Sequence, residues 1–313
     1  MSRHDLVAIV HGTPDLGTMP EVIGNTLHGF TVVCHADPAP PIRLPQDRRT
    51  LLKRAAHRQK ICEALMQSGT VLPALPQQPV SLSQITDLIL ANLPALQNWT
   101  AKYARLVQYQ VTVTWDEPKV LGYFRTAPEI TPLYARQSVT AEQIGRAVHD
   151  LADRLAQQMA QSLTTVALET QTLPDTGNGL INMVLLMPET AEPILDEAVT
   201  TIDAIWTEGL QIRQIGPGPA GSFLSLAARQ VTREDVEAAK SLLGLKLINR
   251  DDISRSAKAL LRKADAHNAH DIRDAACILE AAGRLGRPET GFVLLEPWAE
   301  GTSQASNMAR RVA

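Results

Sequence analysis

The nine residues Val107-Gln-Tyr-Gln-Val-Thr-Val-Thr-Trp115 alternate strictly between apolar and polar side chains. A period of two over this length is typical of a β-strand with one face against a core and one polar face. Five further segments before residue 217 predict two helices and three strands. They are the helices 140–159 and 191–205 and the strands 164–172, 180–187 and 210–215. Residue 107 therefore begins a strand–helix–strand–strand–helix–strand order.

This order predicts a ferredoxin-like βαββαβ sandwich, in which the first and third strands are central. The third strand, Leu180–Met187, suits a central place because it is apolar on both faces apart from Asn182. Two helices can cover only one face of such a sheet. The other face must therefore meet the N-terminal residues, the C-terminal residues or a partner protein, and cover from within the chain is the favoured interpretation.

The fold class is α+β, with two domains and a C-terminal helical extension. We expect an N-terminal α+β domain over residues 1–106 and the ferredoxin-like domain over residues 107–230. Residues 231–313 predict the helical extension and a polar tail, and the favoured role of these helices is to cap the open sheet face. In the N-terminal domain, strands are expected at Leu6–Val10 and Phe30–His35.

Helices are predicted at three places in the N-terminal domain. The segments are Gln46–Ser68, 81–93 and 94–106, the last as a separate helix that begins at Pro94. The proline-containing stretch Asp116–Gln137 is expected to be an irregular insertion.

The predicted helix Gln46–Ser68 has a basic face. It contains six Lys and Arg residues against Asp47 and Glu63. Such a face is often simply solvated, but it also suits an acidic partner. Arg54, Arg58 and Lys60 are the candidates for electrostatic docking.

Composition limits the classes of function. The 313 residues are 44% hydrophobic, which is enough for buried cores, and the net charge is −3 with a pI near 6.2. Neither this charge nor the aromatic content of 4% favours nucleic-acid binding. No apolar run approaches the roughly 20 residues of a membrane helix. The three widely spaced cysteines are typical of reduced thiols, so we expect a cytoplasmic protein that binds no membrane.

Motifs for catalysis are weak throughout the sequence. His267 and His270 could be metal ligands, with Asp271 and Cys277 nearby, but no fourth partner follows at a fixed spacing. Cys34 could form a catalytic pair with His11, His28 or His35, which also lie near predicted strand ends, although packing residues are the favoured interpretation. We therefore predict no catalytic residue, no cofactor and no metal.

The loop Gly216-Pro-Gly-Pro-Ala-Gly-Ser-Phe223 resembles the Gly-Pro-Trp-Pro-Pro-Tyr-Ser-Phe loop of the gas vesicle protein F/L family (GvpF/GvpL). The opening strand Leu6–Val10 with Gly12 is similar to that of the family. So is the helical segment His57–Leu65, followed by Thr70-Val-Leu-Pro73. The resemblance covers roughly residues 5–245, and it departs from the family at Ala74–Gln78, where the usual Arg-Phe-Gly-Thr is missing.

The resemblance implies a non-enzymatic gas vesicle assembly factor or minor vesicle component, located in the cytoplasm and at the gas vesicle. Its expected partners are the small hydrophobic shell protein and other gas vesicle accessory proteins. A partner for such a subunit needs exposed apolar surface or strand edges and no reaction centre. The candidate residues form a rigid turn at the domain junction. They are Gly216, Pro217, Pro219, Ser222 and Phe223.

Two other functions remain open from the sequence. One is a small-molecule or metal-dependent enzyme built on the ferredoxin-like domain. The other is a co-chaperone-like regulatory module that acts through the C-terminal helices.

Overall fold

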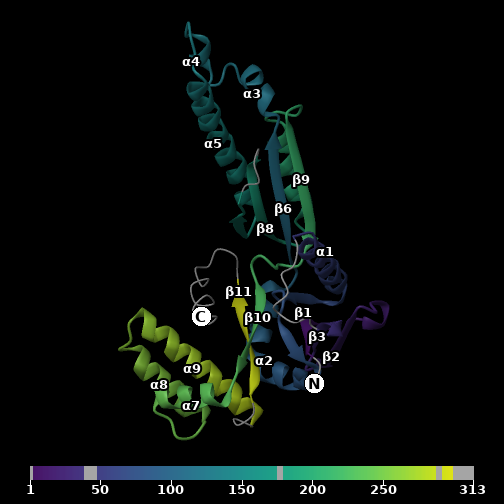
Figure 1. Cartoon of the computed structure of the whole chain (residues 1–313), viewed down its shortest axis with the longest axis vertical. Coiled ribbons are helices and arrows are strands. Elements are labelled where there is room, and N and C mark those ends of the chain that lie inside the picture. Colours follow the sequence, from purple (N-terminus) through teal and green to yellow (C-terminus); the bar gives the residue numbers. More distant parts are fainter. Residues whose placement is uncertain (1–2, 39–47, 175–178, 287–290, 299–313) are drawn as a thin grey trace. The chain divides into compact units, whose positions relative to one another are not determined.

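The computed structural model describes residues 3–38, 48–174, 179–286 and 291–298 (Figure 1). The chain divides into two compact units. Unit 1 combines Met1–Ala104 with Leu224–Ala299, and unit 2 contains Arg105–Phe223.

Unit 2 contains a four-stranded antiparallel sheet. Its strands are β6 (Leu106–Trp115), β7 (Glu169–Thr172), β8 (Gly179–Pro188) and β9 (Leu210–Gly218). They lie in the order β7-β8-β6-β9, so the first and third strands of the unit are central, as the apolar character of β8 predicts. Every second residue of β6 is buried, which confirms the alternation seen in the sequence.

Two helices, α5 (Ala141–Val166) and α6 (Glu192–Asp203), pack on one face of this sheet. Thr140 and Gln143 form a capping box at the start of α5, in which the side chain of each accepts from the other residue's backbone N–H. The prediction of a strand from residue 164 is wrong in its first half, because α5 continues to Val166. The Thr164 and Thr165 hydroxyls donate to carbonyls one turn back, so these β-branched residues fit the helix.

The stretch Asp116–Gln137, expected to be irregular, contains two short helices, α3 (Glu117–Tyr123) and α4 (Thr131–Tyr134). Tyr123 stacks on the buried Trp206 with ring centroids 4.9 Å apart, and this contact fixes the end of α3. Helices as short as α3 and α4 span too few turns for the spacing of their apolar residues to predict them.

Unit 1 contains a five-stranded sheet. Its strands are β1 (Arg3–His11), β2 (Val22–Leu27), β3 (Phe30–Pro38), β4 (Thr70–Pro73) and β5 (Pro79–Ser81). The order is β2-β3-β1-β4, and β5 pairs with β1 next to β4. Short 3₁₀ turns lie at Leu16–Thr18, Met66–Ser68 and Leu82–Gln84. The predicted strands at Leu6–Val10 and Phe30–His35 are confirmed.

Two long helices pack on this sheet. The C-terminal half of α1 (Arg48–Leu65) buries Ile61, Cys62 and Leu65 in a core with β1, β3 and β4. α2 (Ile85–Tyr103) contacts β2, β3 and β4. The prediction of a separate helix from Pro94 is wrong, because α2 runs through this proline and buries apolar residues on both sides of it.

The C-terminal residues complete unit 1. They form the antiparallel pair β10 (Ser225–Val231) and β11 (Phe292–Trp298) and the helices α7 (Arg233–Leu243), α8 (Arg250–Leu261) and α9 (Ala266–Leu285). These elements share one buried cluster with Ala91 of α2. The sequence predicts three consecutive segments instead, with a separate extension after residue 230. The difference arises because the pairing of distant strands leaves no local pattern.

Candidate interaction surface

The sheet of unit 2 has one face without helices, here called the helix-free face. It is composed of alternate residues from all four strands, identified by their register. They are Gln108, Gln110, Thr112, Thr114, Glu169, Gln171, Asn182, Val184, Leu186, Gln211, Arg213 and Ile215. The face is therefore mostly polar, with aliphatic side chains at one end.

A polar network joins the central strands on this face. Asn182 Oδ1 accepts from Gln110 Nε2 at 2.8 Å and from Thr112 Oγ1 at 3.3 Å. Asn182 Nδ2 donates to the carbonyl of Pro174 at 3.1 Å. Asn182, the one interruption of the apolar third strand, thus fixes the positions of its neighbours' polar side chains.

The loop after β9 folds back across the helix-free face. The backbone N–H of Ser222 donates to Gln108 Oε1 at 2.9 Å, and its carbonyl accepts from Gln171 Nε2 at 3.0 Å. Gln108 and Gln171 lie on the two strands that flank β8, so the Ser222 peptide crosses β8. Val184 and Leu186 are buried at this crossing.

Gly216 is the backbone position on which this turn depends. The Gly216–Pro217 peptide bond is cis, and Gly216 has a φ of +138°. A Cβ at this position would lie 2.7 Å from the Gln108 carbonyl oxygen and 2.7 Å from Tyr109 Cδ1. Any side chain would therefore collide with β6, and only glycine fits.

The structure separates the candidate loop residues into two groups. Gly216 and Pro217 are exposed next to Ile215, which is 43% exposed. Pro219 and Phe223 are buried, and Ser222 is half-buried with its backbone bonded. Pro219 and Phe223 thus shape the turn and are not available for contact with a partner, whereas Gly216 and Pro217 are.

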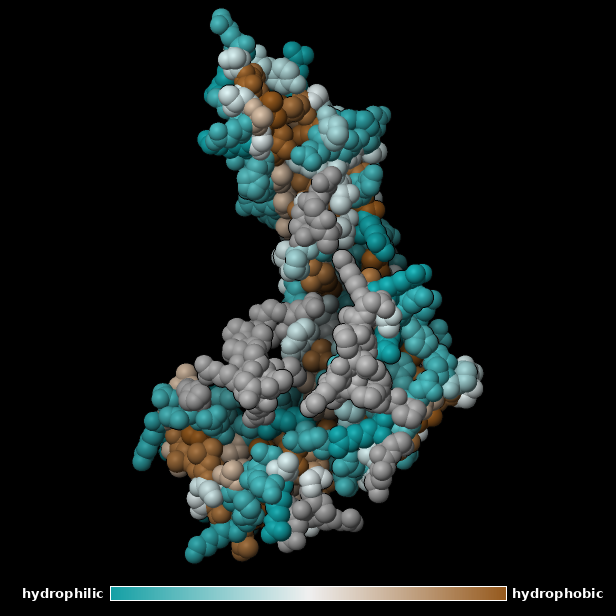
Figure 2. Space-filling model, viewed as in Figure 1, coloured by the Kyte–Doolittle hydropathy of each residue, from teal (hydrophilic) through white to brown (hydrophobic). Residues whose placement is uncertain are grey.

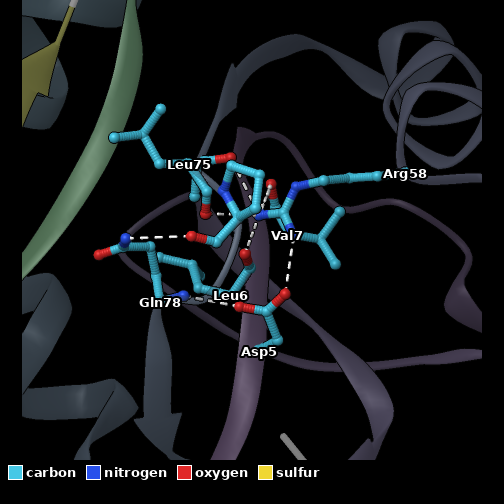
Figure 3. A network of polar contacts seen from close by, with 8 residues as sticks. Asp5, Leu6, Val7, Arg58, Leu75 and Gln78 are labelled. Carbon is cyan, nitrogen blue, oxygen red and sulfur yellow. Dashed lines mark hydrogen bonds and ion pairs between the residues drawn. The ribbon is translucent and has the colours of Figure 1, made fainter. Parts of the chain in front are cut away.

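Arg58 does not lie on the basic surface of α1 as the sequence predicts. Its side chain is 11% exposed and points into unit 1 (Figure 3). Nη1 donates to Asp5 Oδ2 at 3.0 Å, and Nη2 donates to the backbone carbonyls of β1 and of the segment after β4. The periodicity of the helix could have located it, because Arg58 shares a face with Ile61, Cys62 and Leu65. Arg54 and Lys60 are exposed, as predicted.

Cys34 and Cys62 are both buried. Burial raises the pKa of the Cys34 thiol to about 12 and that of Cys62 to about 11. Such thiols stay protonated and are weak nucleophiles. His35, beside Cys34, has its pKa lowered by burial and then by the Arg58 guanidinium. This pair therefore packs in unit 1 and has no activated nucleophile.

Within the residues that the structure describes, no group of three or more His, Cys, Asp or Glu side chains is arranged to hold a metal ion. The side chain of His267, a candidate ligand, lies outside the described part. Across the same residues, no helix is both long and apolar enough to cross a bilayer.

Exposed apolar side chains are distributed over both units. Figure 2 shows hydrophobic residues gathered at the end of unit 2 that carries α3 and α4, where Tyr123 and Tyr134 are also exposed. On the rest of unit 2, the exposed aliphatic side chains are Leu168 between α5 and β7, Ile194 on α6 and Ile215 on β9. Ile215 directly precedes Gly216 and Pro217 and so borders the loop.

Comparison with solved structures identifies similar folds. The crystal structure of the gas vesicle protein GvpF from Anabaena sp. matches with a TM-score of 0.52 and 21% sequence identity, over 70% of this chain and 97% of that one. The crystal structure of GvpF from Microcystis aeruginosa has the same TM-score and identity, over 71% of this chain and 99% of that one. A comparison with curated protein sequences gave no match.

The chain is thus a mixed α/β protein with antiparallel sheets, of the class to which these gas vesicle proteins belong. Residues 21–225 match the family described as gas vesicle synthesis protein GvpL/GvpF. The chain belongs to this GvpL/GvpF family, and its role is related to gas vesicles.

Proposed function

We propose that the chain is a non-enzymatic assembly factor that binds the small hydrophobic shell protein during gas vesicle formation. It acts in the cytoplasm and at the vesicle as a minor component, and other gas vesicle accessory proteins are further partners. Unit 2, as a ferredoxin-like domain, is the part that binds. Membership in the gas vesicle synthesis family supports the proposal.

The observation that carries the proposal is the exposed apolar corner Ile215–Pro217. It lies at the end of β9, which is an edge strand of the sheet. An edge strand offers unpaired backbone groups to an extended segment, and apolar side chains beside it add affinity and register. Ser222, Pro219 and Phe223 hold the turn in place behind this corner.

Co-expression with a tagged shell protein tests the proposal. Ile215→Glu places a charge in the corner and is expected to abolish retention on the shell protein. Ile194→Glu is the matched control, because Ile194 is 51% exposed on the opposite, helical side of unit 2. Equal retention of both variants and the unchanged protein would exclude the corner, and no retention of the unchanged protein would exclude the function.

A further inference from the structure

The outward face of α1 presents a stripe of cations. At 100° per residue, Arg49, Lys53 and Lys60 fall within about 40° of one another around the helix. They lie roughly 150° from the middle of the buried face formed by Ile61, Cys62 and Leu65. All three cations are exposed.

These cations have little internal compensation. Among the described residues, none of the three makes an ion pair, and the acidic residue within α1 is Glu63, which accepts from Gln59 at 2.9 Å. Arg54 adds a fourth exposed cation on another side of the same helix. By contrast, Arg58, which is buried, is paired with Asp5. The stripe is thus a local positive surface on a chain whose net charge is −3.

Apolar surface borders the stripe. Leu52 is 61% exposed, and Ala55 and Ala56 beside it are exposed as well. These three side chains of the first half of α1 are therefore left uncovered, whereas the second half of the helix is anchored in the core. A helix that shows charge and apolar surface side by side matches a helix of complementary pattern.

We propose that the outward face of α1 docks an acidic α-helical segment of a partner protein. Carboxylates spaced four residues apart would meet Arg49 and Lys53, and an apolar side chain of the partner would cover Leu52. Single-stranded nucleic acid is disfavoured because the stripe has no aromatic side chains for stacking, and duplex nucleic acid is an outcome of the test below. A bilayer is disfavoured because Leu52 is the single large exposed aliphatic residue in the described part of α1.

This inference is independent of shell-protein binding at Ile215–Pro217, because α1 belongs to unit 1 and the loop to unit 2. The two proposals can therefore be rejected independently, because a variant at one site leaves the residues of the other site unchanged.

The test uses the full-length protein and a labelled synthetic helical peptide with Glu at four-residue spacing and one Leu beside each pair. Fluorescence anisotropy is expected to show saturable binding that weakens about tenfold or more in R49E/K53E/K60E. Leu52→Gln is expected to weaken it further by a few-fold. The matched control K258E/R262E/K263E reverses three exposed cations of the α8 end and is expected to bind as the unchanged protein does.

Three outcomes would overturn the proposal. One is the absence of saturable peptide binding, and another is equal weakening by the α8 control. The third is stronger binding of a duplex oligonucleotide or of phosphatidylserine vesicles than of the peptide, lost in the same α1 variant. Circular dichroism and unfolding curves of each variant confirm that the loss is not one of folding.

Discussion

Arg58 Nη1 and Asp5 Oδ2 lie 3.0 Å apart inside unit 1, where the regular pairing of the sheet is interrupted. β1 bulges between His4 and Ala8, at the point where its partner changes from β5 to β4. Arg58 Nη2 donates to the carbonyls of Leu6 and Val7 there and to those of Ala74 and Leu75 in the segment that links the two strands. The Arg58 guanidinium thus supplies hydrogen-bond donors to backbone carbonyls at the point where the strand pairing of β1 is irregular.

Arg58→Met should destabilise the protein by about 3–5 kcal/mol, because the nearly buried Asp5 carboxylate loses its cation and keeps only the Gln78 N–H as a donor. Urea unfolding measures the change. Arg54→Met, one turn earlier at an exposed position of α1, should stay within about 0.5 kcal/mol. Similar losses in both variants would mean that the Arg58 contacts contribute nothing specific.

Asn92 on α2 is the second buried polar contact whose removal should be costly. Its Nδ2 donates to the Val293 carbonyl at 2.9 Å, and its Oδ1 accepts from the Leu295 N–H at 2.8 Å. Asn92→Leu should cost about 2–4 kcal/mol, because both β11 groups lose their partner in a buried place. Hydrogen exchange at Leu295 should rise sharply in this variant. The exposed Asn98→Leu is the control, and unchanged protection of Leu295 in Asn92→Leu would contradict the assignment.

Two glycines of unit 2 should respond to alanine in opposite directions. Gly216→Ala should destabilise by at least about 1–3 kcal/mol, because the Cβ collides with β6 at a strained φ. Gly145→Ala should stabilise by about 0.5–1 kcal/mol, since this helical glycine of α5 has open space around its Cβ position. The melting temperatures of the two single variants, each compared with the unchanged protein, test this prediction. A higher melting temperature for Gly216→Ala would contradict it and would show that the loop backbone shifts to make room for the Cβ.

The free energy of unfolding should decrease at acid pH, and protonation of His35 should contribute to this decrease. Its pKa is lowered in the folded protein by burial and then by Arg58, relative to 6.5. The unfolded chain therefore binds the proton more readily, and the contribution present above about pH 6.5 is lost as the pH falls toward the lower folded-state pKa. The melting temperature should thus drop less between pH 7.5 and pH 5 in His35→Gln than in the unchanged protein. His149→Gln, an exposed histidine on α5, should behave like the unchanged protein.

The regular part of unit 2 was predictable because its strands and helices carry strong periodicity. β6 alternates over its whole length, and Thr140 and Gln143 form the capping box that the sequence indicates. The start of β7 was misplaced, because Thr164 and Thr165 have strand propensity but are held in α5 by bonds to the previous turn.

Contacts between distant residues were not predictable in this way. Nothing near Asn92 in the sequence points to β11, 200 residues further on. The sequence predicts a rigid turn in the loop, but no local pattern indicates that Phe223 is buried and Pro217 exposed. Both depend on the Gln108 and Gln171 side chains that hold Ser222.

The discontinuity of unit 1 governs the order of events during synthesis. Residues 105–223 leave the ribosome before β11 is synthesised, so unit 2 can fold first. At that stage Asn92 and the buried side of α2 still lack their contacts with β11. A nascent chain stalled near residue 285 would consequently carry one finished unit and one with uncovered apolar surface, and chaperones would be expected to bind the latter.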